Sequence, residues 1–165
     1  MKTALPPLHA TLWNSPVGRL RLVAHDGALC GVYFEDQTGI PTWARNAPLN
    51  DRHPMLQATV AQLQAYFEGR RQQFDLPLAM LEGTPFQRNV WSQLQHVPYG
   101  QTVSYSQLAT AVGRPAAVRA VGGAVGRNPL GIVLPCHRVV GARGQLTGYT
   151  GGLDRKVALL RLETV

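Results

Sequence analysis

The stretch PCHRV at residues 135–139 places a thiol directly beside an imidazole and a guanidinium. An apolar run at residues 132–134 precedes it, and Pro135 favours an extended backbone at Leu134, so we expect Cys136 at the mouth of a buried strand. A thiolate is the reactive form of cysteine, and neighbouring cations lower the pKa of a thiol. The stretch therefore makes Cys136 a candidate nucleophile. The alternative is a buried, inert core residue, as most lone cysteines are.

Acidic residues are missing from the sequence around this thiol. No Asp or Glu occurs from Gly83 to Leu153, and residues 81–165 carry nine Lys/Arg against three Asp/Glu. Residues 1–80 are nearly balanced, with seven and six. A phosphate backbone attracts arginine and repels carboxylate, so the pattern favours a polyanion partner over an ordinary solvated basic face. It also excludes carboxylate-held magnesium and paired-carboxylate chemistry within this stretch. The arginines concerned are Arg88, Arg114, Arg119, Arg127, Arg138 and Arg143.

The overall composition describes an ordinary globular chain without a cofactor. A length of 165 residues allows one domain or two small ones. The two cysteines, Cys30 and Cys136, form no disulfide framework, and we find neither a signal peptide nor a membrane span, so we expect a cytoplasmic protein. Cys30 and His25 supply two metal ligands at most, and nothing nearby in the sequence completes a set of four. We therefore expect no metal and no cofactor.

The N-terminal half, residues 1–80, predicts a scaffold of strands followed by a helix. Turn residues separate three apolar segments, as in an antiparallel meander, and Cys30 on the third is most simply a core residue. The expected elements are strands at His9–Trp13, Arg19–Ala24 and Ala28–Phe34, a loop at residues 35–52, a helix at Pro54–Glu68 and an extended piece at Phe74–Met80.

The C-terminal half, residues 81–165, predicts a helix-turn-helix. Thr84 and Pro85 begin a helix as N-cap and first residue, and Ser104 opens a second helix that ends near Val112. After a turn at Gly113, a third helix runs from Pro115 to about Val125. A further helix follows at Asp154–Leu162.

The third helix carries almost no long side chains. Arg119 is its one long residue, whereas Ala120, Gly122 and Gly123 leave its surface small. A reader of the major groove needs Asn, Gln, Arg or Lys to reach the bases. A small surface suits a closely approached minor groove without sequence readout. Close helix packing inside the fold explains the glycines equally well.

Several short motifs in one order resemble the O6-alkylguanine-DNA alkyltransferase family. These are RAVG at 119–122, NP at 128–129, PCHRV at 135–139 and GYTGG at 148–152, within a match from about Thr84 to Glu163. The resemblance implies an α/β (α+β) fold with a small ribonuclease-H-like N-terminal domain and a winged-helix-like DNA-binding and catalytic domain. It implies direct-reversal DNA repair, in which O6-alkylguanine, or O4-alkylthymine, is flipped out through the minor groove. The alkyl group then passes irreversibly to the protein, once per molecule.

The resemblance also implies roles for particular residues. Cys136 attacks, His137 takes its proton through a bridging water, and Glu163 orients the imidazole. Tyr105 donates a hydrogen bond to the departing guanine, and Asn128 braces the turn before the active site. Arg119, Ala120, Gly122, Gly123 and Tyr105 contact DNA, while Val139, Tyr149 and Thr150 line the base pocket. The partner is double-stranded DNA carrying O6-alkylguanine, at the nucleoid.

Alternatives remain open at the level of the sequence. His137 fits a satisfied core histidine, Arg138 fits a structural anchor, and Glu163 fits an ion pair with Arg155 or Arg161. A non-catalytic alkyltransferase-like protein carries tryptophan in place of the nucleophile, and Cys136 argues against it. A helix-turn-helix regulator and a Cys-His hydrolase are the other classes. The preference for methyl or bulkier adducts, and any clustering of several copies on DNA, stay open.

Overall fold

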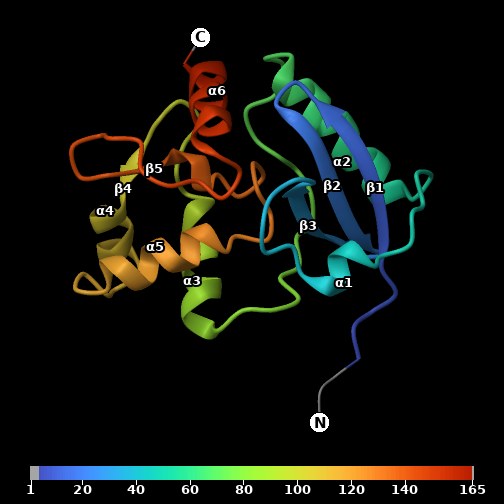
Figure 1. Cartoon of the computed structure of the whole chain (residues 1–165), viewed down its shortest axis with the longest axis horizontal. Coiled ribbons are helices and arrows are strands. Elements are labelled where there is room, and N and C mark those ends of the chain that lie inside the picture. Colours follow the sequence, from blue (N-terminus) through green and yellow to red (C-terminus); the bar gives the residue numbers. More distant parts are fainter. Residues whose placement is uncertain (1–3, 165) are drawn as a thin grey trace. The chain divides into compact units, whose positions relative to one another are not determined.

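The computed structural model describes residues 4–164, and the chain divides between Leu81 and Glu82 into two compact units (Figure 1). The family resemblance predicts a mixed α/β fold of two parts, and the structure is of that class. In the described part of the chain, no helix is both long and apolar enough to cross a membrane.

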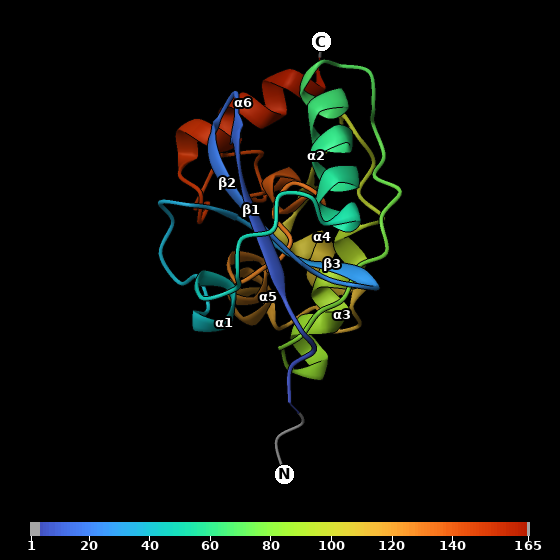
Figure 2. The same ribbon diagram turned by 90° about the vertical axis from the view of Figure 1, so that its right-hand side faces the viewer.

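The N-terminal unit is built on an antiparallel three-stranded sheet in the order β1-β2-β3. The predicted meander is confirmed, with β1 at His9–Ser15, β2 at Gly18–His25 and β3 at Ala28–Phe34. Helix α2, Pro54–Phe67, packs across all three strands through its buried face (Figure 2). Helix and sheet thereby bury one shared apolar layer.

The predicted loop at residues 35–52 is more ordered than its polar composition indicated. It contains the short helix α1, Thr42–Arg45, and its Leu49 makes an isolated parallel bridge to Ala10 of β1. Its alanines pack against sheet residues, and the resulting core cluster includes Ala10, Val23, Cys30, Tyr33, Ala44 and Ala47. This segment covers the sheet in addition to α2, and β3 is therefore buried along its whole length.

Two expectations for this unit have clear outcomes. Cys30 is a core residue as predicted, fully buried, and burial raises the pKa of its thiol to about 12. The extended piece predicted at Phe74–Met80 contains one isolated parallel bridge, from Leu78 to Leu29, and forms no longer strand. Pro77 contributes a carbonyl to the Leu29 amide but has no N–H of its own, so the ladder stops there.

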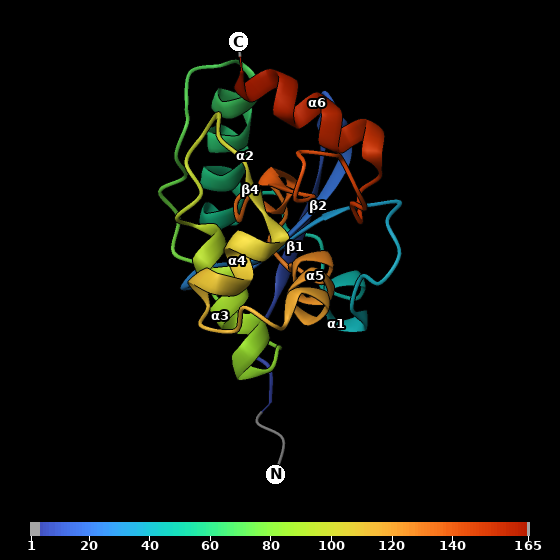
Figure 3. The same ribbon diagram turned by 90° about the vertical axis from the view of Figure 1, so that its left-hand side faces the viewer.

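The C-terminal unit begins with three helices, and capping residues correctly predicted the starts of the first two. Helix α3, Pro85–Leu94, has a full capping box from Thr84, and α4, Tyr105–Ala111, has one from Ser104. Helix α5, Val118–Gly126, contacts both (Figure 3). It begins three residues later than predicted, because Arg114–Ala117 forms a separate turn in which the Ala117 amide donates to the Arg114 carbonyl.

The remaining elements of this unit frame the candidate site. The 3₁₀ turn η1, Cys136–Arg138, leads into β5, Val139–Val140, which pairs in parallel with β4, Val103–Ser104. Helix α6, Leu153–Glu163, packs against η1. The pairing of β4 with β5 fixes the start of α4 beside the chain that leaves the candidate nucleophile.

Candidate active site

The segment before Cys136 forms tight turns, and the predicted strand at residues 132–134 is wrong. Ile132 has a φ of 68°, and the Val133 amide donates to the Gly131 carbonyl across it at 2.7 Å. A β-branched residue rarely adopts this left-handed conformation, which costs about 1–3 kcal/mol. Cys136 itself lies in the 3₁₀ turn and not on an extended backbone. Periodicity missed this because buried apolar residues occur in turns as well as strands.

Asn128 holds both ends of this strained loop. Its side-chain oxygen accepts from the Leu130 amide at 3.0 Å, and its side-chain nitrogen donates to the Leu134 carbonyl at 2.8 Å. The side chain is buried, so the two bonds also satisfy its polar atoms. Asn128 follows the end of α5 and thereby couples that helix to the segment that carries Cys136.

The thiol of Cys136 is nearly buried, with 8% of the residue exposed. Burial raises its pKa above that of an ordinary thiol, although side-chain hydrogen bonds from Asn128 and Tyr149 and the charge of Lys156 act in the opposite direction. The lowered pKa expected from the adjacent His137 and Arg138 is therefore wrong. At neutral pH the group is a thiol, and its use as a nucleophile requires a base.

His137 and Glu163 form a fully buried pair behind the thiol. The His137 Nε2 atom lies 2.8 Å from Glu163 Oε2, and both side chains are at most 1% exposed. Burial lowers the pKa of His137, while the Glu163 carboxylate partly raises it, and the net direction is down. A neutral ring that donates from Nε2 keeps its lone pair on Nδ1, and that atom has no hydrogen-bond partner within residues 4–164.

Arg138 holds the Glu163 carboxylate in place. This agrees with its interpretation as a structural anchor. Its Nε donates to Glu163 Oε1 at 2.7 Å and its Nη2 to Oε2 at 2.9 Å, while Nη1 donates to the Val97 carbonyl at 2.7 Å. The guanidinium also lies 5.6 Å from the ring centre of Tyr99. Glu163 thus pairs with both His137 and Arg138.

Lys156 is a site residue that the sequence reasoning missed. It is fully buried, and its Nζ donates to the carbonyls of Val139 at 2.6 Å, Thr147 at 3.1 Å and Gly148 at 3.3 Å. It therefore ties α6 to β5 and to the loop that follows. The available signal was helical spacing, because Lys156, Leu159 and Glu163 share one face of α6, and charges on an apolar face are rarely incidental.

The other predicted pocket residues surround this centre with different exposures. Val139 is fully buried, Tyr149 is half-buried and Thr150 is exposed. The Thr150 hydroxyl donates to the Gly126 carbonyl at 2.6 Å, so it fastens the loop to the end of α5. Tyr105 opens α4, and its hydroxyl makes a long contact of 3.5 Å to the Thr147 carbonyl. Burial raises the pKa of this phenol.

Helix α5 has one buried and one exposed face. Val121, Ala124 and Val125 are buried, and Trp91 of α3 donates to the Ala124 carbonyl at 2.7 Å. Arg119, Ala120 and Gly123 are exposed. A Cβ at Gly123 would meet nothing within 4 Å, and one at Gly122 would only touch the Tyr105 ring at 3.9 Å. Packing inside the unit therefore does not account for these glycines.

The arginines between Gly83 and Leu153, where the sequence has no Asp or Glu, also include both buried and exposed residues. Arg138 is buried and paired, whereas the other five are exposed: Arg88, Arg114, Arg119, Arg127 and Arg143. The candidate active site contains no group of three metal-ligand side chains among the residues that the structure describes. Its chemistry is that of a thiol, a neutral imidazole and a carboxylate.

Comparison with known proteins gives matches over both units. Residues 8–80 match the family described as "6-O-methylguanine DNA methyltransferase, ribonuclease-like domain", and residues 85–165 match its "DNA binding domain". A methylated-DNA–protein-cysteine methyltransferase of Mycolicibacterium paratuberculosis is 48% identical over 153 residues, which cover 91% of this chain and 88% of the relative. One of Methanosarcina acetivorans is 41% identical and covers 94% and 98%.

Solved structures agree with these relatives. The crystal structure of Mycobacterium tuberculosis O6-methylguanine methyltransferase is 44% identical, covers 95% of this chain and 93% of its own, and superposes with a TM-score of 0.85. The same TM-score and identity are found for a Mycobacterium tuberculosis OGT structure in complex with DNA, which covers 94% of this chain and 92% of its own.

Proposed function

This chain belongs to the 6-O-methylguanine DNA methyltransferase family and is a DNA-repair methyltransferase that acts by direct reversal, and we propose that Cys136 receives the alkyl group. The observation that carries this assignment is the buried row of Cys136, His137 and Glu163. The substrate is O6-alkylguanine in double-stranded DNA, and the same displacement applies to O4-alkylthymine. Such a protein acts at the nucleoid, in the cytoplasm.

The reaction is a displacement at the alkyl carbon. The Cys136 sulfur forms a bond to that carbon while the bond from carbon to O6 breaks, and the electron pair stays with guanine. The Tyr105 hydroxyl, whose raised pKa keeps it protonated, donates a hydrogen bond to the departing base. The product thioether is a poor leaving group. The protein is therefore consumed, because Cys30 is buried in the other unit and offers no resolving thiol.

Proton transfer follows from the tautomer of His137. Glu163 accepts from Nε2, so the lone pair on Nδ1 takes the thiol proton. Nδ1 makes no direct bond to sulfur among the described residues, so we infer that one water relays the proton between the two atoms. The imidazolium that forms is stabilised by Glu163, while Arg138 keeps that carboxylate ionised and fixed.

Lys156 and Asn128 prepare the pocket for the thiolate. The Lys156 charge favours the ionised sulfur, and its bonds to Val139, Thr147 and Gly148 hold the base-binding loop against β5. Asn128 fixes the strained turn and hydrogen-bonds the thiol. These groups offset part of the burial penalty that disfavours a charge at this position.

DNA binds at the exposed face of α5. The smooth surface at Ala120, Gly122 and Gly123 allows close approach to a minor groove, and Arg119 fills the place of the flipped base. The exposed arginines contact phosphates, so affinity for undamaged duplex depends on salt more than on sequence.

Intact-mass spectrometry after mixing the protein with duplex DNA containing O6-methylguanine tests this function. The expected result is one methyl in place of one hydrogen, located by fragmentation on the peptide that contains Cys136. Cys136→Ser should show no adduct while it still binds DNA, and Cys30→Ser should react like the unaltered protein. A methyl group on any other residue, or transfer by Cys136→Ala, would exclude the proposed nucleophile.

A further inference from the structure

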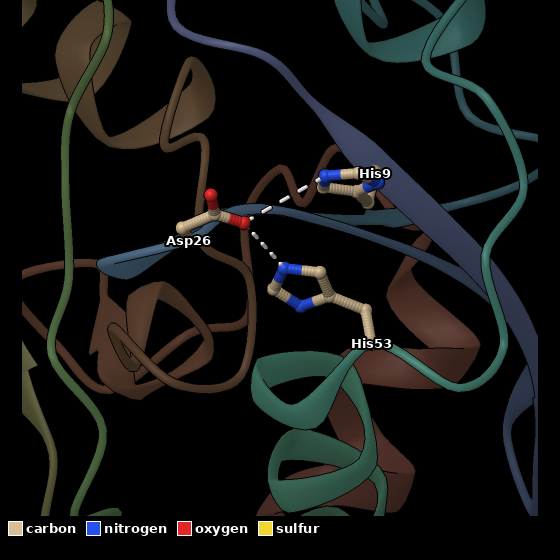
Figure 4. Close-up of side chains that lie close together, drawn as sticks. All are labelled: His9, Asp26 and His53. Carbon is tan, nitrogen blue, oxygen red and sulfur yellow. Dashed lines mark hydrogen bonds and ion pairs between the residues drawn. The ribbon is translucent and has the colours of Figure 1, made fainter.

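Three side chains of the kinds that bind metal ions meet in the N-terminal unit, away from the candidate nucleophile in the C-terminal unit. His9 begins β1, Asp26 lies in the turn between β2 and β3, and His53 is the N-cap of α2. Figure 4 shows both imidazoles directing a ring nitrogen at the Asp26 carboxylate. One ligand atom from each residue lies within 4.8 Å of the other two.

The spacing of these atoms is near that of a metal site. His53 Nε2 is 3.0 Å and His9 Nε2 is 3.8 Å from Asp26 Oδ1. In tetrahedral zinc, with bonds of 2.0–2.1 Å, ligand atoms lie about 3.3 Å apart. Small movements of the side chains therefore bring all three into coordination. The two rings are stacked with centres 4.5 Å apart, which holds their Nε2 atoms on the same side.

We propose that His9, Asp26 and His53 bind one zinc ion, which fastens the N-terminal unit together. Two imidazoles and a carboxylate are a donor set that suits zinc. The Asp26 side chain is 87% exposed, so the fourth coordination position faces solvent. The sequence gave no sign of this site, because the ligands are far apart in the chain and form no spacing motif.

Hydrogen bonds at the Nδ1 atom of each imidazole would have to adjust when zinc binds to Nε2. His9 Nδ1 lies 3.4 Å from the side-chain nitrogen of Asn50, and a flip of that amide presents its oxygen to an Nδ1 proton. His53 Nδ1 accepts from the Met55 amide at 3.3 Å. A neutral His53 that binds metal through Nε2 carries its proton on Nδ1, so this long capping bond must be given up.

The ion would act on stability and not on alkyl transfer. It would add coordinate bonds between the start of β1, the β2–β3 turn and the start of α2, which the β1–β2 ladder and the His53–Asp26 hydrogen bond already hold close together. A ligand that binds only the folded state raises the melting temperature by mass action. Because both histidines must lose protons from the coordinating atoms, uptake should also weaken in acid.

Zinc binding to the full-length protein, purified with chelator and then dialysed against zinc, tests the proposal. Metal content, calorimetric titration with Zn²⁺ and thermal melts are the readouts, with Mg²⁺ as the comparison ion. The expected result is one zinc per chain and a higher melting temperature that chelator reverses, with no effect of Mg²⁺. Asp26→Asn and His53→Asn should weaken zinc binding at least tenfold. His53→Asn retains an N-cap acceptor, so it separates metal loss from helix loss.

Two controls make the assignment specific. His96→Ala removes an exposed histidine of the other unit and should leave zinc uptake unchanged. Cys136→Ser removes the reactive thiol and should also leave it unchanged. No zinc retained after dialysis, unaltered uptake by His53→Asn, or uptake that disappears in Cys136→Ser would each overturn the proposal. Alkyl transfer by the unaltered protein is measured in parallel, and its outcome does not bear on the metal site.

Discussion

Replacing Glu163 by Gln removes a charge that serves two neighbours at once. Both carboxylate oxygens bond Arg138, whose residue is only 6% exposed, and one of them bonds His137. An uncompensated buried charge costs about 3–5 kcal/mol. For a chain of this size, with about 2–4 °C per kcal/mol, the C-terminal unit should melt roughly 6–20 °C lower.

The same change should slow alkyl transfer. Without the carboxylate, the His137 ring loses the acceptor that fixes its tautomer and the charge that stabilises the imidazolium. General-base assistance contributes about 10²–10⁴-fold, so the single-turnover rate with methylated duplex should fall by a factor within this range. Rapid quenching and product counting measure it.

A double variant separates stability from chemistry. Adding Arg138→Met to Glu163→Gln removes both charges of the pair, so most of the lost stability should return while the rate stays low. Glu68→Gln is the matched control, because its pair with Arg70 is exposed and should affect neither measurement. A Glu163→Gln protein with unaltered melting and unaltered rate would refute the reasoning.

Other perturbations test separate parts of the site. Arg119→Ala should slow repair in duplex DNA more than reaction with free O6-benzylguanine, and equal losses would show that Arg119 does not act in flipping. Burial lowers the pKa of His137 in the folded chain. Below the pKa of an ordinary histidine, the unfolded chain therefore binds a proton more readily than the folded chain does. Stability should therefore fall as pH drops below about 6.5, by at most about 1.4 kcal/mol per pH unit, and urea melts of His137→Asn should lack this part of the slope. Lys156→Met should raise the Cys136 pKa further, seen as a shift of thiol alkylation to higher pH, and an unshifted profile would show that its charge does not reach the sulfur.

Local capping chemistry made much of the fold predictable. Thr84 and Ser104 identified the starts of α3 and α4. In each case the N-cap hydroxyl accepts from the backbone amide of a glutamine three residues later, and the side chain of that glutamine accepts from the backbone amide of the N-cap residue. The hairpin residues around Gly18 likewise identified the meander, where a φ of 125° requires glycine. These signals depend on a few adjacent residues, so they survive without knowledge of the tertiary structure.

Features that depend on distant contacts could not be predicted. Ile132 adopts its strained φ only because Asn128 holds both ends of the loop, and the residue itself favours a strand. The cation near the thiol is Lys156 from α6, twenty positions along the chain, while the adjacent Arg138 turns toward Glu163. Proximity in sequence therefore indicated the wrong cation, and only packing of α6 on η1 identifies the right one.

Titration of the protein with excess O6-methylguanine duplex tests the central claim most directly. Repaired guanine and methylated protein are counted in the same samples, with Cys136→Ser as the blank. If Cys136 is the final acceptor, both quantities should rise together, level off at one per chain, and stay there on longer incubation. Repaired guanine that continues to accumulate beyond one equivalent, or that exceeds the methylated protein, would contradict the account.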